Sequence, residues 1–155
     1  MSSALLILSG CASPRTPAVR SPDTQTWTGR LSLRIDSEPA QSFAALFELT
    51  GAPEAGELTL TSPIGNTLAV LRWSPDQAQL LSGGDIKRYA TLSELIQAAT
   101  GAAIPVPALF GWLAGRDEPV PGWRPNLSQV AQGRLQATRE SPRPEAELRV
   151  IFERQ

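Results

Sequence analysis

The chain contains 155 residues, of which 41% are apolar and 19% are charged, and its formal net charge is −1. This length suits one domain with a sizeable core. The 14 basic residues are matched by 15 acidic ones, which argues against nucleic-acid binding because phosphate contacts need a concentrated basic face. The chain has no histidine and one cysteine, so histidine-dependent catalysis, histidine-ligated zinc and an internal disulfide are excluded. We therefore expect no enzyme activity, no metal site and no cofactor.

The first residues have the pattern of a lipoprotein signal. A short apolar run ends in Leu8-Ser9-Gly10-Cys11, which fits the bacterial lipobox, where the cysteine thiol takes a diacylglyceryl group and cleavage makes it the new N-terminus. The sequence thus predicts a signal peptide over 1–10, a lipidated Cys11 with a Pro/Ser/Thr-rich tether over 11–25, and one folded domain over 26–155. The alternative is an ordinary buried cysteine near the terminus.

The folded part begins with short segments in which apolar and polar residues alternate, the period-2 pattern of half-buried strands. The predicted strands cover residues 27–35, 42–49, 57–61, 67–73, 78–81 and 86–89. The turns between them are rich in Ser, Pro, Gly and Asp, and they are too short for crossover connections. The pattern therefore predicts antiparallel hairpins.

The period then changes to that of a helix. Thr91 and Glu94 form a capping box, and the apolar residues of 92–99 fall on one helical face. A second short, very apolar helix is expected over about 107–114, and strands return at about 127–131, 134–139 and 147–153. This order predicts an α+β fold, in which an antiparallel sheet carries helices against one face.

The apolar helix pair must cover an apolar surface. If the sheet curves, its concave face and the helices would enclose a cavity suited to an acyl chain. The other interpretation is that the same residues make a filled core, and the pattern alone favours that one.

One turn is unusual. In Ser62-Pro63-Ile64-Gly65, the fixed φ of Pro63 suits a tight turn, but turn tips favour Gly, Asn, Asp and Ser over a β-branched apolar residue. Either the loop folds back and Ile64 joins the core, or Ile64 protrudes. The pattern leaves both open.

Taken together, these residues resemble the LolB family of outer-membrane lipoproteins, and the resemblance covers nearly all of residues 11–155. It rests on the lipobox, the Gly29-Arg30 strand, LTSPIGNT at 60–67, TGAAIP at 100–105 and LFGWLAG at 109–115. The family fold is an incompletely closed antiparallel β-barrel with a helical lid over a hydrophobic cavity, and it is related to the fold of the carrier LolA.

The resemblance implies a non-enzymatic, monomeric protein that Cys11 anchors to the periplasmic face of the outer membrane. Such a protein accepts acylated lipoproteins from the periplasmic carrier LolA and inserts them among outer-membrane lipids, using Pro63, Ile64 and Gly65 as a membrane-insertion loop. We expect Phe110 and Trp112 to lie on a movable lid and to become less exposed on ligand binding. The expected cavity and lid residues are Leu33, Phe43, Phe47, Leu60, Val70, Leu95, Ile96, Leu109, Phe110, Trp112 and Leu113.

Two other functions fit the same sequence. The first is a lipoprotein of this fold that binds another apolar ligand, such as free lipid. The second is a structural accessory lipoprotein of an envelope complex, with a filled core.

Overall fold

The computed structural model describes residues 24–100 and 104–155. Cys11, the predicted signal peptide and nearly all of the predicted tether lie outside the described residues. Within them the chain forms a single antiparallel sheet of nine strands in the order β6-β5-β4-β3-β2-β1-β9-β8-β7. The strands are β1 (Gln25–Ile35), β2 (Gln41–Gly51), β3 (Gly56–Thr61), β4 (Thr67–Ser74), β5 (Gln77–Ser82), β6 (Asp85–Tyr89), β7 (Trp123–Asn126), β8 (Arg134–Arg139) and β9 (Ala146–Arg154).

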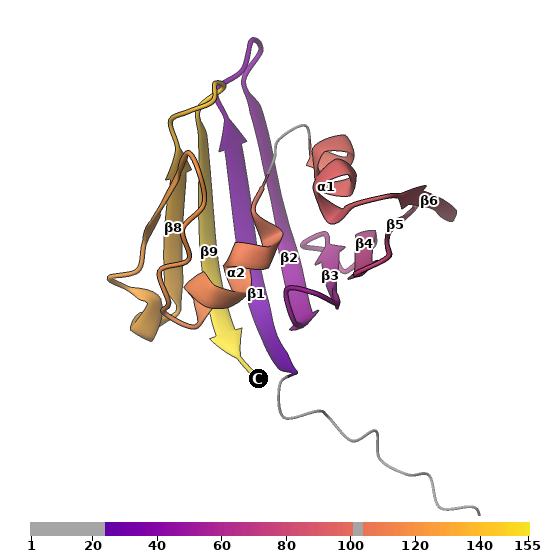
Figure 1. Cartoon of the computed structure of the whole chain (residues 1–155), viewed down its shortest axis with the longest axis horizontal. Helices are drawn as coiled ribbons and strands as arrows, with labels where there is room; N and C mark the ends of the chain where they lie inside the picture. Colours follow the sequence, from indigo (N-terminus) through magenta and orange to yellow (C-terminus); the bar gives the residue numbers. More distant parts are fainter. Residues whose placement is uncertain (1–23, 101–103) are drawn as a thin grey trace, which may run out of the picture.

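The sheet curves but does not close, because β6 and β7 lie at its two edges and do not pair with each other (Figure 1). The long strand β1 lies inside the sheet and pairs with β2 on one side and with β9 on the other. The predicted α+β fold with an incompletely closed antiparallel barrel is confirmed. Of the predicted strands, all but the one at 127–131 are present, with ends that differ by at most two residues.

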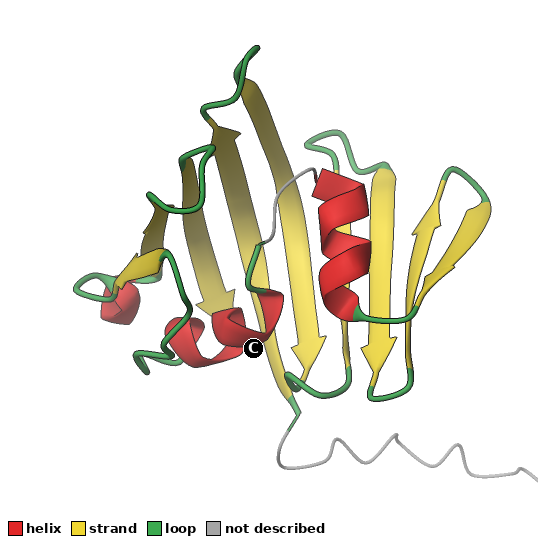
Figure 2. Ribbon diagram, turned by 45° about the horizontal axis from the view of Figure 1, so that its top comes forward, coloured by secondary structure: helices red, strands yellow, loops and turns green. Residues whose placement is uncertain are grey.

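The helices lie over the concave face of the sheet (Figure 2). Helix α1 (Leu92–Thr100) packs against β5 and β6, and its first turn is capped as predicted, since the backbone N–H of Glu94 donates to the Thr91 hydroxyl at 3.2 Å. Helix α2 (Val106–Leu113) has every residue buried except Pro107. In the described part of the chain, no helix has the length and apolar character needed to cross a bilayer.

The prediction of a strand at 127–131 is wrong. The Asn126 side chain accepts hydrogen bonds from the backbone N–H of Ser128 at 3.1 Å and from its hydroxyl at 2.7 Å, so the chain turns there. A single 3-10 turn, Val130–Gln132, follows, and the strand that pairs with β8 is instead the preceding segment, β7. The apolar residues at 127 and 130 mimicked alternation without belonging to a ladder.

Gly29 allows β1 and β9 to approach closely. A Cβ at this position would lie 2.0 Å from the carbonyl oxygen of Ile151 on β9, so no other residue fits without moving the backbone. The inward residues of β1 on either side, Trp27 and Leu31, are buried in the core.

Candidate ligand cavity and exposed hairpin tip

An apolar cavity of about 400 Å³ lies between the concave face of the sheet and the helices. Its wall comes from β1 to β5 and β9, and its cover from Ile96 and Ala99 of α1, Ile104 of the link and the start of α2. Its lining is Leu31, Leu33, Ile35, Gln41, Ser42, Phe43, Leu58, Leu60, Leu68, Ala69, Leu71, Leu80, Ser82, Ile96, Ala99, Ile104, Val106, Leu109 and Leu148. This volume and apolar lining are typical of a site for an aliphatic ligand. The polar lining residues are Gln41, Ser42 and Ser82, which lie near one end of the cavity.

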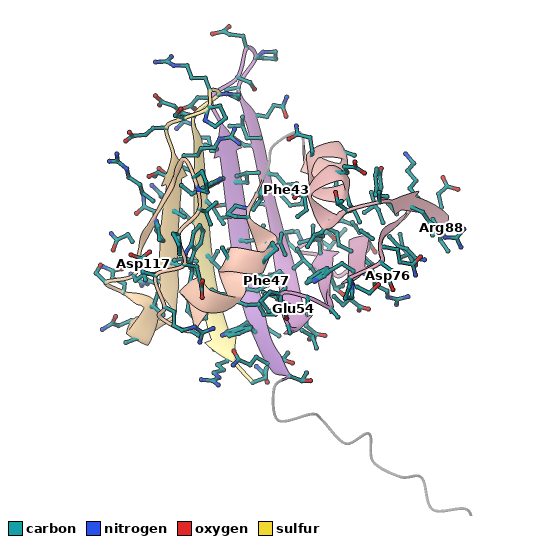
Figure 3. The ribbon with its side chains drawn as sticks, viewed as in Figure 1. Phe43, Phe47, Glu54, Asp76, Arg88 and Asp117 are labelled. Carbon is teal, nitrogen blue, oxygen red and sulfur yellow. The ribbon has the colours of Figure 1, made fainter. Side chains whose placement is uncertain are left out.

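The cavity reaches the surface at one end of the barrel, where β1 and β3 end and β2 and β4 begin. We call this the mouth end. Phe43 and Leu68 line the cavity there, and each is 38% exposed. Figure 3 shows Phe43 on β2, on the side of the strand that α1 covers. Leu68 lies at a β-bulge. Leu60 pairs with Ala69 but Thr61 pairs with Thr67, so Leu68 is an extra residue at the start of β4.

The turn between β3 and β4 projects from the same end. The N–H of Gly65 donates to the carbonyl of Ser62 at 2.9 Å, the N–H of Ser62 donates to the carbonyl of Asn66 at 2.8 Å, and Gly65 has a φ of +92°. This is a three-residue hairpin loop whose last position requires glycine. Ile64 at its tip is 85% exposed, the most exposed large apolar residue described. Of the two interpretations of this turn, the structure supports the protruding one.

Comparison with known proteins agrees with this geometry. The sequence matches the family described as "Outer membrane lipoprotein LolB" over residues 24–152. This chain belongs to the LolB family. The match includes both helices, the exposed hairpin and the whole sheet apart from the last residues of β9.

Individual LolB relatives are moderately similar in sequence. A protein of Ralstonia nicotianae named Outer-membrane lipoprotein LolB is 34% identical over 142 residues, which cover 84% of this chain and 66% of the relative. A protein of the same name from Bordetella petrii is 30% identical over 134 residues, covering 83% of this chain and 66% of the relative. A third, from Shewanella loihica, is 29% identical over 121 residues, covering 73% and 55%. The chain thus spans less than two thirds of the length of the relatives it matches.

The predicted cavity residues fall into two groups of five in this LolB fold, and Val70 belongs to neither. Leu33, Phe43, Leu60, Ile96 and Leu109 line the cavity. Phe47, Leu95, Phe110, Trp112 and Leu113 are buried in the core but lie outside the lining. Val70 was placed on the wrong face: it pairs with Thr59, which points away from the cavity between inward Leu58 and Leu60. The bulge at Leu68 reverses the alternation of β4, so Ala69 and Leu71 face inward instead.

Helix α2 is packed into the interior of the barrel, and its first residues also line the cavity. The ring of Phe110 lies edge-on to Trp27 of β1 at 5.7 Å and to Trp73 of β4 at 6.1 Å between centroids. Trp112 is completely buried, packs on Trp123, and donates its indole N–H to the Glu118 carbonyl at 3.0 Å. The expectation that Phe110 and Trp112 lose exposure on binding is therefore wrong, because neither has exposure to lose.

Sequence reasoning missed more than half of the cavity lining. Leu31, Ile35 and Leu58 follow the same alternation as the predicted residues on their strands, so the signal for them was present. Leu80 on β5 and Leu148 on β9 are distant in sequence from the β1 residues that line the cavity. Their approach to the cavity depends on strand order, which a local sequence pattern does not encode.

The charged groups of the described residues do not gather into a metal site. No group of three or more carboxylates, cysteines or histidines lies close enough to hold a metal ion there. The ion pairs among the described residues lie at the surface, such as Arg72 with Glu57 at 2.6 Å and Arg34 with Asp36 at 3.1 Å. Exposed pairs of this kind contribute little to stability. The cavity itself is lined mainly by apolar side chains.

Proposed function

We propose that this protein is an outer-membrane lipoprotein that accepts lipoproteins from the periplasmic carrier LolA, holds their acyl chains in the apolar cavity, and inserts them into the outer membrane. It acts by binding and not by covalent chemistry. Acylated Cys11 anchors it to the periplasmic face, and the domain works as a monomer.

The observation that carries this proposal is that the cavity and the exposed hairpin tip share one end of the barrel. Phe43 and Leu68 at the mouth and Ile64 at the tip all expose apolar surface at this end. A binding protein whose ligand stays inside needs a mouth but no apolar projection beside it. A protein that delivers acyl chains to a bilayer needs both.

Relative affinity drives such a transfer. The sequence has no GxxxxGK[ST] phosphate-binding loop. Burial of each CH₂ group is worth roughly 0.8 kcal/mol, so small differences in fit among the carrier, this cavity and the bilayer give a steep downhill order. A cavity that remains partly open at Phe43 and Leu68 suits an intermediate acceptor, which must release what it binds.

The hairpin tip brings the mouth to the membrane for a short time. Burial of one isoleucine side chain in acyl tails is worth roughly 1.5–3 kcal/mol, which is enough for transient docking and too little for permanent anchoring. Pro63 and the hydrogen bonds between Ser62, Gly65 and Asn66 hold the tip in its projecting shape.

The test uses two readouts on one variant. Ile64→Glu should still accept acylated cargo from the carrier but should fail to release it into liposomes. The matched control is Ile86→Glu, which places the same charge at a 59% exposed isoleucine on edge strand β6. If Ile64→Glu incorporates cargo as well as the control does, the tip is not an insertion element.

The lipid anchor is tested separately. One acyl chain gives marginal membrane binding, and a diacylglyceryl group supplies the two that stable anchoring needs. Intact mass spectrometry of the membrane fraction should find a chain that begins at Cys11 and carries the acyl mass. An unmodified chain that retains Met1 would contradict the anchor.

A lipoprotein that binds free lipid would use the same cavity. Competition distinguishes the two functions: an acylated lipoprotein should displace a fatty-acid probe far better than free fatty acid does. Equal displacement would favour the lipid-binding function. A structural accessory role with a filled core is not supported, because the concave face encloses open volume.

A further inference from the structure

A basic patch lies on the convex face of the sheet, opposite the cavity. It consists of Arg30 on β1, Arg134 on β8 and Arg149 on β9, gathered around Ile151. Ile151 is the direct cross-strand partner of both Arg30 and Arg134, and its side chain is 61% exposed. The residues beside these arginines in sequence, Leu31 and Leu135 among them, are buried, so the arginines point outward.

The convex face of this half of the sheet is more basic than the chain as a whole. Among the described outward positions of β1, β7, β8 and β9, five arginines occur with two glutamates, whereas the whole chain has a net charge of −1. These residues are Arg30, Arg34, Arg124, Arg134, Arg149, Glu147 and Glu153. Arg149 pairs with Glu147, and Arg34 pairs with Asp36. Arg30 and Arg134 form no ion pair with the described residues, so their guanidinium groups are free for an external anion.

A shallow groove of about 390 Å³ runs beside these residues. Arg134, Arg149 and Ile151 line it, together with polar groups of Asn126 and Gln129. Arg30 and Arg134 are two strands apart, which places their Cα atoms roughly 10 Å from each other on the sheet. The patch therefore offers separated guanidinium groups around one apolar side chain, on the open face of a sheet.

We propose that this basic patch docks on a lipid bilayer with anionic headgroups. The guanidinium groups bind headgroup phosphates, which their planar donors fit, and Ile151 inserts between the headgroups. Each basic residue near an anionic surface contributes only about a factor of five in affinity. Such weak binding would not hold a freely diffusing partner. It is sufficient for a domain already held near the membrane by a lipid anchor, because the anchor raises the effective concentration. In this respect the inference rests on the proposed function.

The two membrane contacts would then serve different stages. The basic patch and the cavity lie on opposite faces of the sheet, so a domain docked through Arg30 and Arg134 keeps its cavity turned away from that contact. The mouth remains open to an incoming carrier. Delivery then requires the domain to turn and present Ile64 at the mouth end. The patch is a resting contact, and the hairpin tip is an inserting one.

The experiment measures vesicle binding by the full chain carrying Cys11→Ala, so that the acyl anchor does not dominate. Vesicles of phosphatidylglycerol and phosphatidylcholine in equal parts should bind this protein, and vesicles of phosphatidylcholine alone should not. Raised salt should weaken the binding, because exposed charges are screened. The double variant Arg30→Glu/Arg134→Glu should lower the affinity by more than about thirtyfold, and Ile151→Ser by about fivefold.

The matched control is Arg88→Glu, on the convex side of edge strand β6, which is far from the patch (Figure 3). Arg88→Glu makes the same charge change as Arg30→Glu alone or Arg134→Glu alone, so it is compared with these two single variants. It should leave vesicle binding within about twofold of the parent, whereas each single patch variant should lower the affinity by more than about fivefold. Melting temperature checks that each variant is folded.

Three results would overturn the proposal. Equal binding of the charge-matched single variants Arg30→Glu and Arg88→Glu would show that net charge, not this patch, determines binding. Binding to neutral vesicles as strong as to anionic ones would remove the role of the arginines. Loss of cargo acceptance from the carrier, with vesicle binding unchanged, would make the patch a docking site for an acidic protein. Affinity for an acylated peptide in solution is measured on the parent and on the same variants. If the parent does not bind the peptide, the result counts against the proposed function and not against the patch.

Discussion

The two ends of the barrel use apolar side chains in opposite ways. At the end where β1 begins, Trp27 and Trp73 hold Phe110 of α2 between them, and all three are buried. At the mouth end, Phe43 and Leu68 are partly exposed beside an open cavity. The closed end stabilises the fold, and the mouth end leaves apolar surface for a ligand. The difference shows that one continuous sheet can supply both a packed core and a cavity when a helix packs against only part of its concave face.

The largest effect on stability should come from the closed end. Phe110→Ala removes a ring packed edge-on against two tryptophans and leaves a cavity, which should lower the free energy of unfolding by about 3–5 kcal/mol. Urea denaturation measures this. A loss below 1 kcal/mol would mean that α2 is not part of the packed core and would remove the distinction between the ends.

A smaller loss is expected from the helix that covers the cavity. Thr91→Ala removes the hydroxyl that accepts from the Glu94 N–H, and it should cost about 1 kcal/mol. Because α1 supplies Ile96 and Ala99 to the cavity, a loosened α1 should also release a bound acyl probe faster. The measurements are thermal denaturation and stopped-flow dissociation. Thr91→Ser keeps a hydroxyl and should behave as the parent does.

Truncation at the mouth should affect binding more than folding. Phe43→Ala removes a ring that is 38% exposed, so we expect a loss of less than about 1.5 kcal/mol of stability. The affinity for an acylated peptide should fall by about tenfold, because the ring lines the cavity where the chain enters. Compared with Phe110→Ala, this variant sharpens the contrast between a binding phenylalanine and a core phenylalanine. A large stability loss with unchanged affinity would contradict it.

The smallest effect on stability is expected at the hairpin tip. Ile64→Glu changes a side chain that is 85% exposed and should alter the free energy of unfolding by no more than about 0.5 kcal/mol. Equilibrium denaturation beside the liposome assay tests this. Destabilisation by several kcal/mol would place Ile64 in the core, and its effect on insertion would then have no specific meaning.

The sequence was most informative where structure depends on local patterns. Alternation identified β1, β2 and β3 with their inward faces, and the Thr91 capping box located the start of α1. Local pattern failed at Val70, because the bulge at Leu68, two residues earlier, reverses the alternation and leaves no local mark in an apolar strand.

The candidate site was predicted less well than the fold. Whether an inward apolar side chain lines a cavity or fills a core depends on what lies opposite. Phe43 and Phe47 occupy equivalent inward positions on β2, yet Phe43 lines the cavity and Phe47 is packed in the core. Figure 3 shows Phe47 beside α2 and Phe43 nearer α1, so helix placement decides between them. Alternation along β2 carries no information on that placement.

The central claim is that the cavity itself binds acyl chains, and filling it tests this most directly. Ala69 lines the cavity and is half-buried, so Ala69→Trp should occupy the volume into which a chain would pass. Titration with an acylated peptide should show binding by the parent and at least about tenfold weaker binding by Ala69→Trp, with melting temperatures that agree within a few degrees. The same peptide without its acyl chain should bind neither protein. Equal affinity of the folded Ala69→Trp variant and the parent for the acylated peptide would contradict the account.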